Sequence, residues 1–163
     1  MPGCGKTTLG QKLAEKLNVG FYDLDELIEK QTGHTVKLIF EKFGEDYFRK
    51  VETEMLEYFL EGKNYFVLAS GGGTPCFNGN MDKMNKAATT IFLDVDQEEL
   101  VKRLSSNTNF GRPLLQVENV EEKIKNTLSE RKVFYELAKH QITSNTIDVD
   151  MIIKLLEKES NSK

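Results

Sequence analysis

The first residues of the chain have the types and spacing that bind a nucleotide phosphate. The sequence opens Met-Pro-Gly-Cys-Gly-Lys-Thr-Thr, which is all but the first residue of the pattern G-x-x-x-x-G-K-[ST]. Gly3 and Gly5 would let backbone N–H groups approach phosphate oxygens closely. We expect Lys6 to reach the β- and γ-phosphates and Thr7 to offer its hydroxyl to Mg²⁺. The alternative is a glycine-rich turn followed by chance by Lys-Thr, but an amphipathic helix follows at once, as the motif requires.

Two carboxylates, Asp23 and Asp25, follow the next apolar run. Side chains alternate along a strand, so both carboxylates are expected on one side. One could then bind Mg²⁺, and the other could accept a hydroxyl proton. The alternative is that Asp25 caps the helix that follows.

Arg49 lies one helical turn from both Glu45 and Glu52. A plain surface salt bridge would explain this spacing. However, Arg49 also shares a helix face with Leu56, which indicates that its side chain points inward.

Two further features are candidates for ligand contact. Gly71–Gly73 end an apolar strand, which indicates either close approach of backbone to a ligand or a flexible turn. Arg131 lies on an apolar helix stripe between Leu128 and Tyr135, where an arginine is costly unless it is paired. It therefore bonds a buried carboxylate, belonging either to the protein or to a ligand, and its planar fork suits that group.

A polar segment, 105–116, carries Arg112 within Gly-Arg-Pro-Leu-Leu. A loop with one arginine fits a lid that closes on phosphates and excludes water. The alternative is a solvated loop arginine.

Alternating helices and strands position these residues. Apolar periodicity predicts helices at 7–17, 25–31, 36–43, 46–60, 82–88, 96–104 (opened by a capping box of Asp96 and Glu99), 120–135 and 148–158. Compact apolar runs predict strands at 21–24, 65–70, 89–95 and 141–144. This order predicts a single α/β domain over 1–163, a parallel sheet between two helical layers. Ligands of such sheets bind beyond the carboxyl ends of the strands.

The phosphate-binding motif normally follows a buried central strand, and the sequence does not contain one before Gly3. We therefore expect the true chain to start upstream, with its first central strand missing here. If the chain really begins at Met1, we predict that it is unstable and weakly active or inactive.

Composition limits the possible functions. The 163 residues suffice for one core, and a net charge of −4 does not favour nucleic-acid or acidic-membrane binding. Apolar runs are too short to span a bilayer, and we see no secretion signal. Cys4 and Cys76 are interpreted as free thiols of a cytoplasmic protein. The two histidines and two cysteines form no zinc-binding pattern.

Taken in order, the motifs resemble the shikimate kinase family over nearly the whole chain. The set is the phosphate loop, Asp-Leu-Asp at 23–25, Phe-Arg-x-x-Glu at 48–52, Gly-Gly-Gly at 71–73, Arg-Pro-Leu-Leu at 112–115, and an arginine four residues before Tyr135. The resemblance implies a P-loop kinase fold with strand order 2-3-1-4-5, an acceptor-binding segment at about 25–60 and a lid at about 105–117. It also implies transfer of the γ-phosphoryl group of ATP to the 3-hydroxyl of shikimate.

The resemblance further implies a role for each position. ATP would contact Gly3, Cys4, Gly5, Lys6, Thr7, Thr8 and Arg112, and Thr7 and Asp23 would serve Mg²⁺. Shikimate would contact Asp25, Arg49, Glu52, Gly71, Gly72, Gly73 and Arg131. Lys6, Asp25 and Arg112 would act in catalysis, while Arg103 and residues near Asn145 would lie at the adenine. The partners would be ATP and shikimate only, with no nucleic acid or membrane, and the protein a monomer.

Two alternatives remain open. Another small-molecule kinase of the same group, such as a gluconate kinase, would share the phosphate loop but would not need two inward arginines set for a carboxylate. A nucleotide-binding protein without catalysis is favoured only by the absent strand.

Overall fold

The computed structural model of the protein describes residues 1–62, 65–106 and 120–161. The elements run in the order α1 (Lys6–Leu17), β1 (Gly20–Asp23), α2 (Leu24–Thr32), α3 (Val36–Glu61), β2 (Phe66–Ala69), the 3₁₀ turn η1 (Thr74–Cys76), α4 (Asn80–Ala87), β3 (Ile91–Asp94), α5 (Gln97–Ser106), α6 (Val120–Tyr135), β4 (His140–Thr143) and α7 (Val149–Ser160). Each predicted helix and strand over described residues is present, with shifts of a few residues at the ends.

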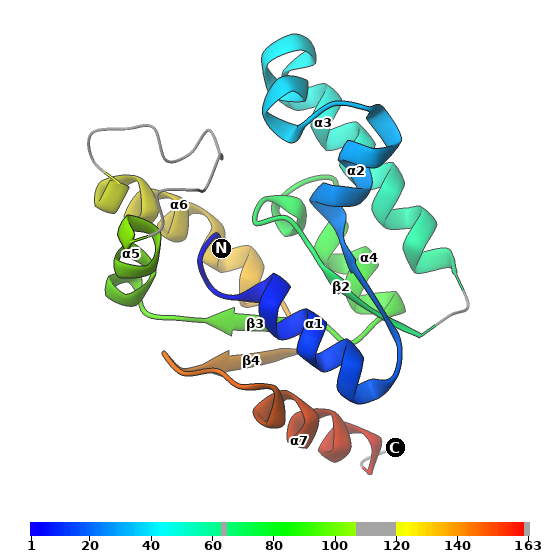
Figure 1. The fold of residues 1–163 in the computed structure, drawn as a ribbon, viewed down its shortest axis with the longest axis vertical. Helices are drawn as coiled ribbons and strands as arrows, with labels where there is room; N and C mark the ends of the chain where they lie inside the picture. The colour runs from blue at the N-terminus through cyan, green and yellow to red at the C-terminus, as the bar shows by residue number, and fades with distance from the viewer. Residues whose placement is uncertain (63–64, 107–119, 162–163) are drawn as a thin grey trace.

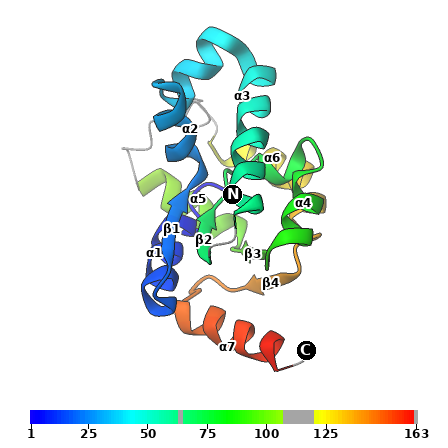
Figure 2. The same ribbon diagram turned by 90° about the vertical axis from the view of Figure 1, so that its right-hand side faces the viewer.

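The strands form two parallel pairs (Figures 1 and 2). In one pair β1 lies beside β2, from Gly20 opposite Phe66 to Asp23 opposite Ala69. In the other, β3 lies beside β4, from Ile91 opposite His140 to Asp94 opposite Thr143. The expected parallel pairing is therefore confirmed. A single continuous sheet is not seen in the described residues, because β2 and β3 do not pair, and the order 2-3-1-4-5 stays a prediction.

A cavity of about 650 Å³ separates the two strand pairs. Its walls include β2 residues 67–69, β3 residues 91–93, and the apolar side chains Leu9 and Leu13 of α1.

Two buried apolar clusters lie around this cavity. One joins β3, α5 and α6 through Phe92, Val95, Leu100, Leu104, Ile124 and Tyr135. The other joins α2, α3 and α4 through Leu24, Ile28, Ile39, Phe48, Leu56, Met81 and Met84. In Figure 2, α1 lies on one side of β1 and β2 and α4 on the other, so helices cover both faces of this strand pair.

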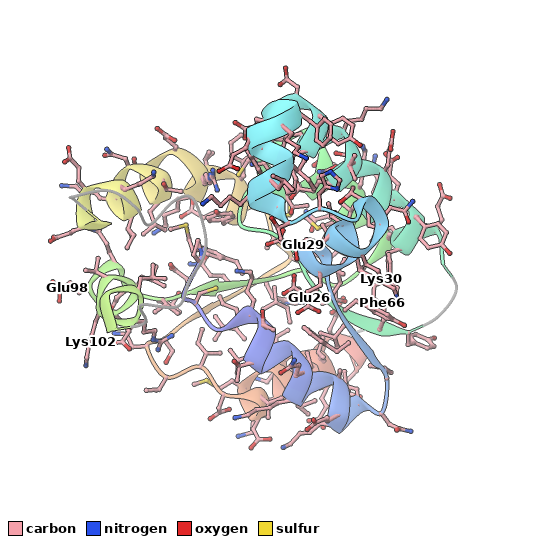
Figure 3. The ribbon with its side chains drawn as sticks, turned by 45° about the horizontal axis from the view of Figure 1, so that its top comes forward. Glu26, Glu29, Lys30, Phe66, Glu98 and Lys102 are labelled. Atoms are coloured by element: carbon pink, nitrogen blue, oxygen red, sulfur yellow. The ribbon has the colours of Figure 1, made fainter. Side chains whose placement is uncertain are left out.

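Helix α5 shows how a polar and an apolar face share one element. Leu100 and Leu104 are buried, while Glu98 and Lys102 lie on its outer side (Figure 3). The predicted capping box at its start is wrong. Asp96 instead exchanges hydrogen bonds with the side chain of Asn145, and Glu99 accepts one from Arg103.

The two helices predicted at 36–43 and 46–60 form one element, α3, with a kink at Gly44. Gly44 has φ 82° and ψ 174°, a conformation that a residue with a Cβ rarely adopts. The kink redirects the chain immediately before the segment that carries Arg49.

No helix in the described part of the chain combines the length and apolar character needed to cross a bilayer.

Candidate functional site

The phosphate loop ends in helix α1, as the motif predicts. Gly3 and Gly5 have φ of 77° and 89°, which explains glycine at both positions. Gly5 is the residue before the helix, so the free N–H groups of its first turn open toward the loop. Lys6 donates from Nζ to the carbonyl oxygen of Met1 at 2.7 Å, so its ammonium folds back over the loop.

Thr7 and Asp23, the predicted metal pair, lie together. The Thr7 hydroxyl donates to Oδ2 of Asp23 at 3.0 Å, and a hydroxyl with a carboxylate is a donor set that Mg²⁺ prefers. In the described ranges there is no group of three or more Asp, Glu, His or Cys side chains that could hold a metal alone.

Asp25 does not lie on a strand, so the alternation argument is wrong. β1 ends at Asp23, and Asp25 is in the first turn of α2. The expected alternative is also wrong, because Asp23 rather than Asp25 caps the helix, accepting from the Asp25 N–H at 3.1 Å. Asp25 nevertheless reaches the glycine run: its Oδ1 lies 3.1 Å from the place of a Cβ on Gly71.

Arg49 is held by two carboxylates and is also turned inward, so both interpretations of its spacing apply. Nη1 donates to Oε2 of Glu52 at 2.7 Å, and Nε and Nη2 donate to Oε1 of Glu45 at 3.1 and 3.0 Å. Only 11% of the Arg49 side chain is exposed, against 52% of Glu45 and 1% of Glu52. Glu52 is therefore the buried anchor of the guanidinium.

Thr74 completes this anchor and was not identified from the sequence. Its hydroxyl donates to Oε1 of Glu52 at 2.6 Å, and both side chains are buried. Thr74 comes directly after Gly73 in η1, where no periodicity marks it as buried. A threonine following three glycines was the only available signal.

The glycine run lies between the two candidate arginines and the phosphate loop. A Cβ on Gly73 would lie 2.6 Å from Nη2 of Arg49. A Cβ on Gly72 would lie 3.5 Å from Cδ of Pro2 and 3.9 Å from Nη1 of Arg131. Close approach to the Arg49 guanidinium therefore explains glycine at position 73, and the run continues into η1 rather than a loose turn. The expected approach of this backbone to a ligand stays a prediction.

Arg131 is half-buried beside Tyr135, as its place on the apolar stripe predicts. The Tyr135 hydroxyl donates to the carbonyl oxygen of Gly72 at 2.6 Å, which ties α6 to the glycine run. Burial raises the pKa of Tyr135 to about 12. Within the described residues, no carboxylate forms an ion pair with Arg131, so the ligand alternative for its partner is retained.

Arg103 lies beside the phosphate loop. Its Nη2 donates to the carbonyl oxygen of Asn145 at 2.6 Å and its Nη1 to that of Gly3 at 3.4 Å. The segment expected at the adenine thus lies next to the loop. Arg112 and all of the predicted lid beyond residue 106 lie outside the described residues.

Comparison with known proteins gives a consistent result. The family model described as shikimate kinase matches residues 2–159. A shikimate kinase from Thermodesulfovibrio yellowstonii is 41% identical over 165 residues, covering 99% of this chain and 94% of that protein.

Solved structures agree with the sequence comparison. A shikimate kinase from Acinetobacter baumannii in complex with shikimate is 37% identical with a TM-score of 0.88, covering 99% of this chain and 89% of that one. A shikimate kinase from Bacteroides thetaiotaomicron is 36% identical, also with a TM-score of 0.88, covering 96% of this chain and 94% of that one.

Proposed function

The chain belongs to the shikimate kinase family, and we propose that it transfers the γ-phosphoryl group of ATP to the 3-hydroxyl of shikimate. Family membership makes it an ATP-dependent phosphotransferase of P-loop α/β fold. The arrangement that carries the proposal is the glycine run at 71–73, which lies against Arg49 and Arg131 and also against the start of the phosphate loop. A carboxylate between the two arginines would place the ring of the acceptor beside the nucleotide.

We assign the nucleotide to the phosphate loop. Backbone N–H groups from Gly3 to Thr8 would surround the phosphates, with Lys6 moving from the Met1 carbonyl oxygen onto the β- and γ-phosphates. Thr7 and Asp23 would hold Mg²⁺, which supplies charge neutralisation to the transferring group when bound. Phosphoryl transfer through a loose transition state needs positioning and charge stabilisation more than covalent help from the protein.

We assign the acceptor to the other side of the glycine run. Arg49 and Arg131 would bind the carboxylate, Glu52 would orient Arg49, and the backbone from Gly71 to Gly73 would lie against the ring. Asp25 would accept a hydrogen bond from the reacting hydroxyl and orient it for attack. Arg112 would close on the transferring phosphate, as its motif implies. We further propose that the protein is a cytoplasmic monomer and that it requires Mg²⁺.

A coupled ADP-release assay with a panel of acceptors tests this function. We expect Mg²⁺-dependent turnover with shikimate, little with gluconate, and a fall of several orders of magnitude in kcat for Lys6→Ala. Preferential turnover of gluconate would contradict the assignment, as would hydrolysis of ATP that no acceptor stimulates.

A further inference from the structure

The guanidinium of Arg49 is covered on one face by an aromatic ring that the family motifs do not include. Cζ of Arg49 lies 4.2 Å from the centroid of Phe77, closer than the 5.1 and 5.9 Å to Phe48 and Phe40. A guanidinium within 6 Å of a ring centroid is attracted by the ring quadrupole, and more strongly where water is excluded. With 11% of the Arg49 side chain exposed, little water competes for that face.

The segment that carries Phe77 is hydrogen-bonded to α3, the helix that carries Arg49. The next residue, Asn78, donates from Nδ2 to the Arg49 carbonyl oxygen at 3.3 Å and to the Thr53 hydroxyl at 2.9 Å. The Thr53 hydroxyl in turn donates to the Arg49 carbonyl oxygen at 2.9 Å. These bonds fix the loop after η1 to the turn of α3 that carries Arg49.

Asn78 also has φ 52°, a left-handed conformation that asparagine tolerates better than most residues. The ring therefore does not rest on Arg49 by chance packing. The ring is held there because the side chain of the next residue, Asn78, donates a hydrogen bond to the carbonyl oxygen of Arg49.

Four groups together restrict the guanidinium. Glu52 accepts from Nη1, Glu45 accepts from Nε and Nη2, Gly73 lies against the Nη1 and Nη2 end, and Phe77 covers a face. The two carboxylates occupy hydrogen-bond donors and carry opposite charge, whereas Phe77 holds the guanidinium without doing either.

We propose that Phe77 is a positioning residue for the acceptor, holding the Arg49 guanidinium by a cation–π contact in the orientation that receives the acceptor carboxylate. The inference rests on the proposed function, because it requires the carboxylate of shikimate to bind Arg49. It adds a residue of the segment after η1 to the acceptor site.

The test compares Phe77→Leu with Phe77→Tyr in the full chain. Leucine keeps an apolar side chain but removes the ring, whereas tyrosine keeps the ring. We expect Phe77→Leu to raise the KM for shikimate by about three- to thirtyfold, the range of a partly desolvated cation–π contact. We expect kcat and the KM for ATP to change less than twofold, and Phe77→Tyr to behave as the unmodified chain.

Two further variants keep the test decisive. Phe77→Met, an unbranched substitution without a ring, should reproduce the leucine result if the leucine variant does not fold. Tyr58→Leu is the matched control: it removes an exposed ring of α3 that is 73% accessible, and it should leave both KM values unchanged.

The outcomes separate this inference from the function on which it rests. Equal shikimate KM values for the leucine, methionine and tyrosine variants would overturn the role of Phe77 while the unmodified chain still phosphorylates shikimate. An equal rise in the KM for ATP would also overturn it. Failure of the unmodified chain to phosphorylate shikimate would overturn the proposed function, and this inference with it.

Discussion

Replacing Thr74 by valine removes one hydroxyl from a buried carboxylate and keeps the shape of the side chain. The 2.6 Å bond from Thr74 to Oε1 of Glu52 is charge-assisted, and the two residues are 0% and 1% exposed. Within the described residues, no other hydrogen bond to Oε1 replaces it. Losing a hydrogen bond to a charged group costs about 1.5–3 kcal/mol. For a chain of 163 residues, this corresponds to a fall in Tm of roughly 3–12 °C.

Urea denaturation followed by circular dichroism measures this loss. We expect a lower midpoint with an unchanged m-value, which indicates a change of stability rather than of the denatured state. Thr74→Ser is the control, because serine keeps the hydroxyl and should restore most of the lost stability.

The same substitution should also affect binding, because Glu52 orients Arg49 through Nη1. We expect a higher KM for shikimate in Thr74→Val and an unchanged KM for ATP. A free energy of unfolding within about 0.5 kcal/mol of the unmodified chain would refute the argument, since that is the ordinary effect of a surface substitution.

Gly73→Ala places a Cβ 2.6 Å from Nη2 of Arg49, so steady-state kinetics should show a rise on the order of tenfold in the shikimate KM; an unchanged KM would mean that the guanidinium moves aside without effect. Arg131→Ala removes a charged donor to the acceptor, and its shikimate KM should rise by roughly 10- to 100-fold while ATP titration stays normal; an equal loss of ATP affinity would contradict the carboxylate assignment. For Tyr135, the folded state keeps the phenol proton to about pH 12 whereas the unfolded state loses it near 10, so the unfolded state binds fewer protons in between and stability falls as pH rises. In Tyr135→Phe, the free energy of unfolding from urea denaturation should fall by about 2–3 kcal/mol less between pH 9 and 12 than in the unmodified chain. Parallel curves of unfolding free energy against pH for the two proteins would show that another group is responsible.

The fold class could be predicted because apolar residues recur at helical spacing in the helices and form short compact runs in the strands. The strand at 66–69 and the helix at 120–135 are marked by compact and by periodic apolar residues respectively, and both are present. The family prediction is confirmed by the comparisons. The two helices predicted on either side of Gly44 are present as the two parts of α3, and the non-helical backbone of Gly44 forms the kink between them.

The site was predictable where the residues belong to a motif. Thr7 and Asp23 were expected together and lie 3.0 Å apart, and Arg49 was expected to turn inward. The roles of Arg49 and Arg131 toward an acceptor stay predictions, as does that of Arg112.

The residues that hold Arg49 and Glu52 in place were not predicted, because their contacts join distant parts of the sequence. The contacts of Thr74 with Glu52, and of Phe77 and Asn78 with Arg49, span 22 to 29 positions of sequence. No local period encodes contacts at such separations. The error at Asp25 has a different cause. The strand ends one residue earlier than its apolar run suggested, because Asp23 caps the next helix.

A crystal structure of the protein with shikimate and an ADP–Mg²⁺ complex would show directly where the acceptor carboxylate binds. We expect the carboxylate to accept hydrogen bonds from Arg49 and Arg131, with the ring against residues 71–73 and a hydroxyl near Asp25. A shikimate molecule bound elsewhere, with both guanidinium groups left to the protein's own carboxylates, would contradict it.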